Sequence, residues 1–247
     1  MYDITQLTLQ DVATIGAHLR KLGKDAGSVE TVATRCVEYL RDSLALPGTQ
    51  EPACALARFF KTCNYQDLPS ELKKQAVSAS GQQGDLPNTV KCLTLMGTTG
   101  EQSDWCDRHT SKGHQSIPLT SEKAISQIPM ISQLIKGLGL EISCVLAPSP
   151  HLWMELERKT CNVFYIETAL GSEFIPAQSS FVEPFGIQSV LGFGGMLSSG
   201  DLFTVILFTK AKVPASTANL LKMLPLNLKM AMTPYLRENT FRVAHTV

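Results

Sequence analysis

The stretch "FGIQSVLGFGGMLSSGDLFTVILFTK", residues 185–210, decides the fold class. Two runs rich in large apolar residues, 185–197 and 201–210, are separated by the short turn "SSG". Two β-rich runs joined by a short turn that contains glycine are typical of an antiparallel hairpin. The second run is apolar at almost every position, which predicts a central strand that is covered on both faces.

Helices are expected on both sides of this hairpin in the sequence. Downstream, apolar residues recur every three or four positions over about 214–235, with Pro214 suited to the first turn of a closing helix. Near the N-terminus, Thr8 and Ser28 are helix-capping residues, each followed by apolar residues at helical spacing within about 8–45. The chain therefore begins and ends in amphipathic helices.

The middle of the chain contains further strand candidates. A helix is expected from Ser121 onwards, with a kink or break at Pro129 because proline lacks a backbone N–H. The order of helices, strands and a terminal hairpin predicts an α+β fold with an antiparallel sheet, in a single domain that spans 1–247. Runs of β character lie at 53–60, 89–96, 161–169 and 140–146, although a helix remains open for the last of these.

Composition excludes several classes of partner. Twenty-two basic residues balance 22 acidic ones, so no net charge attracts nucleic acid or an anionic membrane. Seven cysteines include no CxxC pair and mostly lie in apolar runs, which favours reduced thiols and the cytoplasm. No signal-peptide pattern and no membrane-length apolar stretch occurs. We expect a cytoplasmic protein that binds neither nucleic acid nor a membrane.

The segment "GTTGEQSDWCDRHTSKGHQSIPL", residues 97–119, is the main candidate site. Long connections without periodicity inside a compact domain tend to be functional or disordered. Trp105 favours order, because a large aromatic side chain can bury enough area to hold the loop against the domain. Arg108 and His114 are then donors at the edge of a pocket for an anionic or polar small molecule.

The same segment also admits a purely structural role. In that alternative, Arg108 pairs with Asp104 or Asp107 and only fastens the loop to the domain. The edge of a ligand pocket and a structural clasp remain equally open from the residues alone.

An enzyme is a further alternative. Cys106, His109 and His114 follow a C-x2-H-x4-H spacing and carry the ligand atoms that zinc prefers, but a fourth ligand is missing. Cys106 is also a possible nucleophile, because Arg108 and His109 would stabilise its thiolate, whereas the neighbouring aspartates oppose that effect. No catalytic residue, metal or cofactor is therefore assigned, and a thiol- or metal-dependent enzyme is kept only as an alternative.

The glycine-rich run "LGFGGMLSSG" lacks the GKS/T element of a phosphate loop and is followed by a strand. Gly192, Gly194 and Gly195 indicate a strand with a bulge, or one against which a helix or ligand packs closely. We keep Phe193, Gly194 and Gly195 as candidates for lining a pocket.

The segments "LTLMGTTGEQSDWCDRHTSKGHQSIPL", "PFGIQSVLGFGGML" and "SSGDLFTVILF" resemble an N-terminal sensory module of bacterial multidomain signalling proteins, of the type associated with histidine kinases. The closing strand, turn, strand and helix also resemble the end of a GAF domain. This resemblance implies a GAF-like antiparallel sheet flanked by helices, with long terminal helices that often mediate homodimers. It brings no established ligand or cofactor.

The function implied is a non-catalytic sensory input domain in signal transduction. Such a domain binds a small ligand or another cue and passes the signal through its terminal helices to an output domain or a partner protein. A purely structural protein-docking module is the remaining alternative, and it is favoured if no cavity lies between the loop and the sheet.

Overall fold

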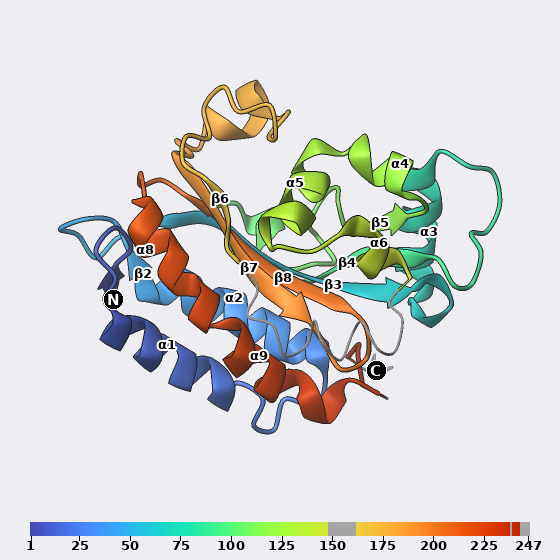
Figure 1. The fold of residues 1–247 in the computed structure, drawn as a ribbon, viewed down its shortest axis with the longest axis horizontal. Coiled ribbons are helices and arrows are strands. Elements are labelled where there is room, and N and C mark those ends of the chain that lie inside the picture. Colours follow the sequence, from blue (N-terminus) through green and yellow to red (C-terminus); the bar gives the residue numbers. More distant parts are fainter. Residues whose placement is uncertain (148–161, 238, 243–247) are drawn as a thin grey trace.

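The computed structural model describes residues 1–147, 162–237 and 239–242 (Figure 1). Within these residues, six strands form one antiparallel sheet in the order β5-β4-β3-β8-β7-β6. The α+β class and the antiparallel sheet flanked by helices are confirmed. The strands are β3 (Cys54–Asn64), β4 (Lys91–Gly100), β5 (Ser116–Leu119), β6 (Phe164–Ile166), β7 (Ser189–Met196) and β8 (Leu202–Thr209). A separate parallel pair joins β1 (Tyr2–Asp3) to β2 (Leu44–Ala45).

The predicted hairpin is present as β7 and β8, which pair in one continuous register. Every residue of β8 is buried, and the strand lies between β3 and β7, so the prediction of a central, doubly covered strand is confirmed. The register has no shift at the glycines, so the bulge considered for β7 does not occur. Register shifts occur elsewhere in the sheet. The β3–β4 pairing skips Met96 of β4, opposite Phe59 and Phe60, and the β3–β8 pairing skips Ala55 of β3.

Asp201 ties the turn of this hairpin to the neighbouring strands. Its carboxylate lies 2.7 Å from Lys61 Nζ of β3 and 2.6 Å from Lys91 Nζ of β4. Burial raises the pKa of the Asp201 carboxyl, but the two ammonium groups outweigh burial and hold the pKa below its usual range. The ionised carboxylate is therefore part of the packed structure.

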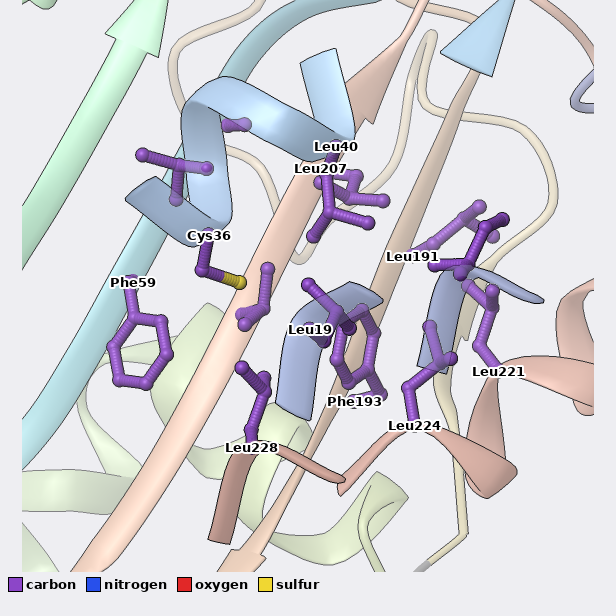
Figure 2. Packing of buried hydrophobic residues seen from close by; sticks show 14 of the residues in the cluster. Leu19, Cys36, Leu40, Phe59, Leu191, Phe193, Leu207, Leu221, Leu224 and Leu228 are labelled. Atoms are coloured by element: carbon purple, nitrogen blue, oxygen red, sulfur yellow. The ribbon is translucent and has the colours of Figure 1, made fainter. Parts of the chain in front are cut away.

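Helices near the two ends of the chain cover the first face of the sheet (Figure 1). They are α1 (Leu9–Lys21), α2 (Val29–Ser43), α8 (Ala215–Leu220) and α9 (Pro225–Met232). Figure 2 shows Leu19, Cys36 and Leu228 from these helices against Phe193 and Leu207 of the sheet. The predicted caps are confirmed, because the Thr8 and Ser28 side chains accept hydrogen bonds from the backbone N–H groups of Asp11 and Thr31.

The closing helix is not continuous, and the prediction of one helix over 214–235 is corrected in this respect. Between α8 and α9 the backbone tightens into a 3-10 turn, Leu221–Met223, and a second such turn, Thr233–Tyr235, follows α9. Pro225 has no N–H to donate to the preceding turn, so the helix restarts there. Apolar periodicity alone does not reveal this break, because α8 and α9 both bury their apolar residues in the same core.

The second face of the sheet carries α4 (Glu122–Ser126), α5 (Pro129–Gly137) and α6 (Ile142–Leu146), while α3 (Ser70–Ser80) contacts β5. The predicted break at Pro129 is confirmed, since the proline begins α5. The strand favoured at 140–146 is wrong, because Cys144 and Val145 point into the core from a short helix. A π-helical turn, Gln178–Val182, and 3-10 turns at Tyr65–Asp67 and Ser103–Trp105 complete the described elements.

Two further sequence predictions concern cysteines and the membrane. The six described cysteines are free, and only Cys106 among them is exposed, while Cys161 lies outside the described residues. Burial raises the pKa of Cys54 to about 12 and that of Cys92 to about 11, so these thiols stay protonated at neutral pH. In the described part of the chain, no helix combines the length and apolarity that a membrane crossing requires.

Candidate ligand-binding cavity

A cavity of about 370 Å³ lies between the second face of the sheet, α5 and the loop that follows β4. Its volume falls within the range of about 300–1,000 Å³ that is usual for small-molecule sites. Its walls are mostly apolar and include the aromatic rings of Phe60, Trp105, Phe181 and Phe208. No acidic side chain is among the described residues that line it.

Strand β3 places an arginine inside this apolar wall. Successive residues of a strand face opposite sides, so Leu56, Arg58 and Phe60 face the cavity while Ala57 and Phe59 enter the core under the terminal helices. Arg58 is only 8% exposed. A cationic side chain is thus held on a rigid central strand within a largely apolar pocket.

The charge of Arg58 has no acidic counterpart among the described ion pairs. Its Nη2 donates to the Ser111 hydroxyl at 3.1 Å, whereas its Nε is buried and has no hydrogen-bond partner. Burial lowers the pKa of the Arg58 guanidinium to about 10, which still leaves it protonated at neutral pH. A buried donor without a partner costs free energy unless a bound group satisfies it.

A second unsatisfied polar atom lies next to Arg58 across the sheet. Thr98 of β4 is directly opposite Arg58 in the register, so both side chains are on the same face. The Thr98 hydroxyl is also buried without a hydrogen-bond partner. Thr98 is not among the residues that line the cavity, so Arg58 is the unsatisfied group that faces it.

The loop over residues 101–115 closes one side of the cavity, and Trp105 anchors it. The Trp105 ring lies 4.6 Å from the Phe185 ring and 5.6 Å from the Phe181 ring, between centroids. A Cβ at Gly100 would lie 2.7 Å from the Trp105 ring, so only glycine lets the indole pack directly on the β4 backbone. Trp105 therefore lines the cavity from this loop.

Arg108 does not line the cavity and instead contacts α2, on the first face of the sheet. Its Nε donates to Glu30 Oε1 at 2.6 Å, both side chains are buried, and its guanidinium lies over the Phe241 ring. The aspartate partners considered from the sequence are wrong, because Asp104 instead approaches Lys112 at 3.2 Å. Arg108 is thus a structural clasp between the loop and the start of α2.

His114 lies at the mouth of the cavity. Its backbone has a φ of +56°, in the left-handed region that residues other than glycine rarely adopt. Partial burial and the nearby charge of Arg58 lower its pKa below the usual range, so the imidazole is neutral at neutral pH. A neutral imidazole can either donate or accept a hydrogen bond from a bound molecule.

The residues of the enzyme alternative do not assemble. The Cys106 thiol is exposed and donates toward the backbone carbonyl of Gly100 at 3.4 Å, while His109 Nε2 lies 3.9 Å from Glu30. In the parts of the chain that the structure describes, no three His, Cys, Asp or Glu side chains gather in a way that could hold a metal ion. Cys106, His109 and His114 are thus not gathered into one such group in the described structure.

The glycine-rich strand contributes nothing to the cavity wall. Phe193 points into the opposite core, beneath α1 and α9 (Figure 2). Gly194 is required for strand packing, since a Cβ there would lie 2.1 Å from the Phe203 carbonyl oxygen. Gly195 pairs with Phe203 in the same ladder. The structure thus brings Trp105 and His114 to the cavity, but not Arg108, Phe193, Gly194 or Gly195.

Arg58 is the main site residue that sequence reasoning missed. The run "ACALARFF" was recognised as a strand, and a charged residue in the middle of such a run was the available signal. A charged side chain is almost never fully buried unless it is paired, so an arginine on a buried strand face indicates a candidate functional site.

No family model matches the chain, and no curated protein matches it. Among solved structures, free methionine-R-sulfoxide reductase from Neisseria meningitidis, in complex with its substrate, is similar at 9% identity and a TM-score of 0.46, covering 95% of this chain and 98% of the other. The phycocyanobilin-bound GAF domain of a cyanobacterial phytochrome is similar at 11% identity and a TM-score of 0.38, covering 94% and 96%. At these values the likeness carries nothing about ligand or activity.

Proposed function

We propose that this protein is a non-catalytic sensory domain, acting in the cytoplasm, whose cavity binds a small molecule with a mainly apolar body. The observation that carries this proposal is the cavity itself, which is of ligand size, mostly aromatic and aliphatic, and supplied with a few polar groups. The ordered loop around Trp105 supports it, because a fixed wall reduces the entropy lost when a ligand binds.

The proposed route for the signal runs from the loop to the C-terminal segment. Ser111 accepts from Arg58 on the cavity side, and Arg108, three residues earlier, donates to Glu30 on the helical side. The second oxygen of the Glu30 carboxylate accepts from the backbone N–H of Arg242 at 2.8 Å. We infer that the loop shifts when a ligand binds, and that this shift alters the hydrogen bond between Glu30 and the C-terminal segment.

Backbone contacts strengthen this connection. The N–H groups of Val29 and Glu30 donate to the carbonyls of Asn239 and Thr240, at 2.9 and 3.0 Å. Hydrogen exchange of the Val29, Glu30 and Arg242 amides, which donate in these contacts, tests the proposed route when measured with and without a bound ligand. Unchanged exchange there at saturating ligand would contradict it.

We also propose that the protein forms a homodimer, through which the signal is passed on. Met223, Leu226 and Met230 leave large apolar side chains exposed along the closing helical segments, on the surface turned away from the sheet. Burying such side chains against a second copy is favourable by about 25 cal/mol per Å². The terminal helices would then pass a change to an output domain or partner protein.

The cavity proposal is tested with the neutral apolar dye N-phenyl-1-naphthylamine, whose fluorescence rises in apolar surroundings. Ala177 is exposed at the cavity wall, so Ala177→Trp should obstruct entry without disturbing the core. Ala79→Trp, at an exposed position on α3, is the matched control. We expect dye binding by the wild type and the control but at least tenfold weaker binding by Ala177→Trp. Equal binding by all three proteins would refute the cavity as the site.

A further inference from the structure

We propose that the ligand of this cavity is an organic acid, with one anionic group bound by Arg58 and an apolar body held among the aromatic side chains. This inference rests on the proposed ligand-binding function and names the chemical class of the ligand. It differs from the sequence-based expectation, in which Arg108 and His114 were the polar donors.

The first argument is the electrostatics of the cavity wall. Arg58, Lys112 and His114 are the described titratable side chains that line it, and none of them is acidic. Lys112 is largely in solvent and already has Asp104 beside it at 3.2 Å. Arg58 is therefore the one buried cation here for which the described residues supply no carboxylate.

The second argument is the unused donor of Arg58. Arg58 is more than nine-tenths buried, and its Nε–H has no acceptor while Nη2 is occupied by Ser111. A carboxylate oxygen can accept from Nε–H, and an arginine guanidinium is well suited to carboxylate geometry.

The third argument is the remainder of the wall. Besides Arg58, the cavity is lined by Phe60, Trp105 and Phe208, together with Ile131 and Leu134 of α5. These side chains favour an aromatic or aliphatic body rather than a sugar or a polyanion. A single buried cation likewise suits one anionic group per ligand.

The test compares probes that share a body and differ in charge. Isothermal titration is carried out with 4-phenylbutyrate, with the neutral 4-phenylbutan-1-ol and with inorganic phosphate, on the full chain. We expect 4-phenylbutyrate to bind at least tenfold more tightly than the alcohol, since a charge-assisted hydrogen bond contributes at least that factor. Phosphate, which lacks the apolar body, should bind at least tenfold more weakly than 4-phenylbutyrate.

Variants assign this preference to Arg58. In Arg58→Met the acid should lose at least tenfold in affinity, while the alcohol stays within about twofold because the apolar wall is intact. Arg20→Met, which removes an exposed arginine of α1 outside the cavity, should change neither affinity. The wild-type comparison needs no variant, so the inference stays testable even if Arg58→Met folds poorly.

The possible outcomes separate the two proposals. Equal affinity for acid and alcohol would overturn the organic-acid inference and leave the ligand-binding cavity standing. Phosphate binding as tight as that of 4-phenylbutyrate would replace the organic acid by an inorganic anion. Binding of none of the probes, with no uptake of the neutral dye, would refute the proposed function itself.

Discussion

Arg58→Met should make the ligand-free protein more stable, although it removes a polar side chain that already has one hydrogen bond. The guanidinium is buried, its Nε has no acceptor, and the described ion pairs give it no carboxylate. A buried charge without a counter-ion opposes folding. Methionine fills a comparable volume with an unbranched apolar chain and suits the neighbouring Leu56 and Phe60.

The size of the expected gain in stability follows from the pKa of Arg58, which burial lowers to about 10. A change of one in a pKa corresponds to about 1.4 kcal/mol, so the cost of keeping this group charged is roughly 3 kcal/mol relative to the unfolded chain. Loss of the hydrogen bond to Ser111 offsets about 1.5 kcal/mol of that. We expect a net gain of about 1–2 kcal/mol, which raises the melting temperature by roughly 2–8 °C in a chain of this size.

The assay is urea denaturation at pH 7 of protein that has been unfolded and refolded by dialysis, so that bound small molecules are lost. Because the folded-state pKa is lowered, the cost is present below that pKa and fades as the pH rises through about 10, so the gain should shrink there. Arg20→Met, at an exposed arginine, should stay within about 0.5 kcal/mol of the wild type. A loss of more than about 1 kcal/mol in Arg58→Met would show that the fold itself compensates the charge, and would refute this reasoning.

Three further predictions concern two buried ion pairs and the proposed dimer. Glu30→Gln should destabilise the protein by about 2–3 kcal/mol in urea denaturation, because it leaves the buried Arg108 with only the half-exposed Glu71 carboxylate, 3.7 Å from its Nη2. Asp104→Asn, in an exposed pair, should change stability by less than about 1 kcal/mol. The pKa of Asp201 is lowered in the folded state, so the stability that this carboxylate contributes is present above its unfolded pKa and is lost as the pH falls through its folded pKa. Asp201→Asn should therefore be several kcal/mol less stable than the wild type at pH 7, and its stability should fall less steeply below about pH 4. Leu226→Glu should halve the mass measured by light scattering if α9 forms the proposed dimer, and an identical mass for wild type and variant would remove that proposal.

Local patterns in the sequence were sufficient for much of the fold. The hairpin of β7 and β8 follows from two apolar runs and a glycine turn, and the starts of α1 and α2 follow from Thr8 and Ser28, since capping uses residues three positions apart. Where an element is short, the local pattern is ambiguous, and 140–146 became a helix because of what it packs against. The break in the closing helix does not follow from periodicity, because the apolar spacing continues past Pro225, where α9 begins.

The candidate site was predicted only in part, because its decisive contacts are distant in the sequence. The anchoring role of Trp105 could be expected from its size, and its aromatic partners come from a segment about 75 residues later. The partner of Arg108 is Glu30, 78 residues away, and nearby aspartates gave no indication of it. The sequence alone does not separate the two roles of the β7 glycines, because a glycine near a ligand and a glycine between packed strands look alike in sequence.

The most direct test of the central claim is a crystal structure of the protein with bound 4-phenylbutyrate. We predict that the carboxylate lies about 3 Å from Arg58 Nε, with the phenyl ring among Phe60, Trp105 and Phe208. A probe bound elsewhere, or one that lies in the cavity with its carboxylate in solvent and Arg58 Nε still without a partner, would contradict the account.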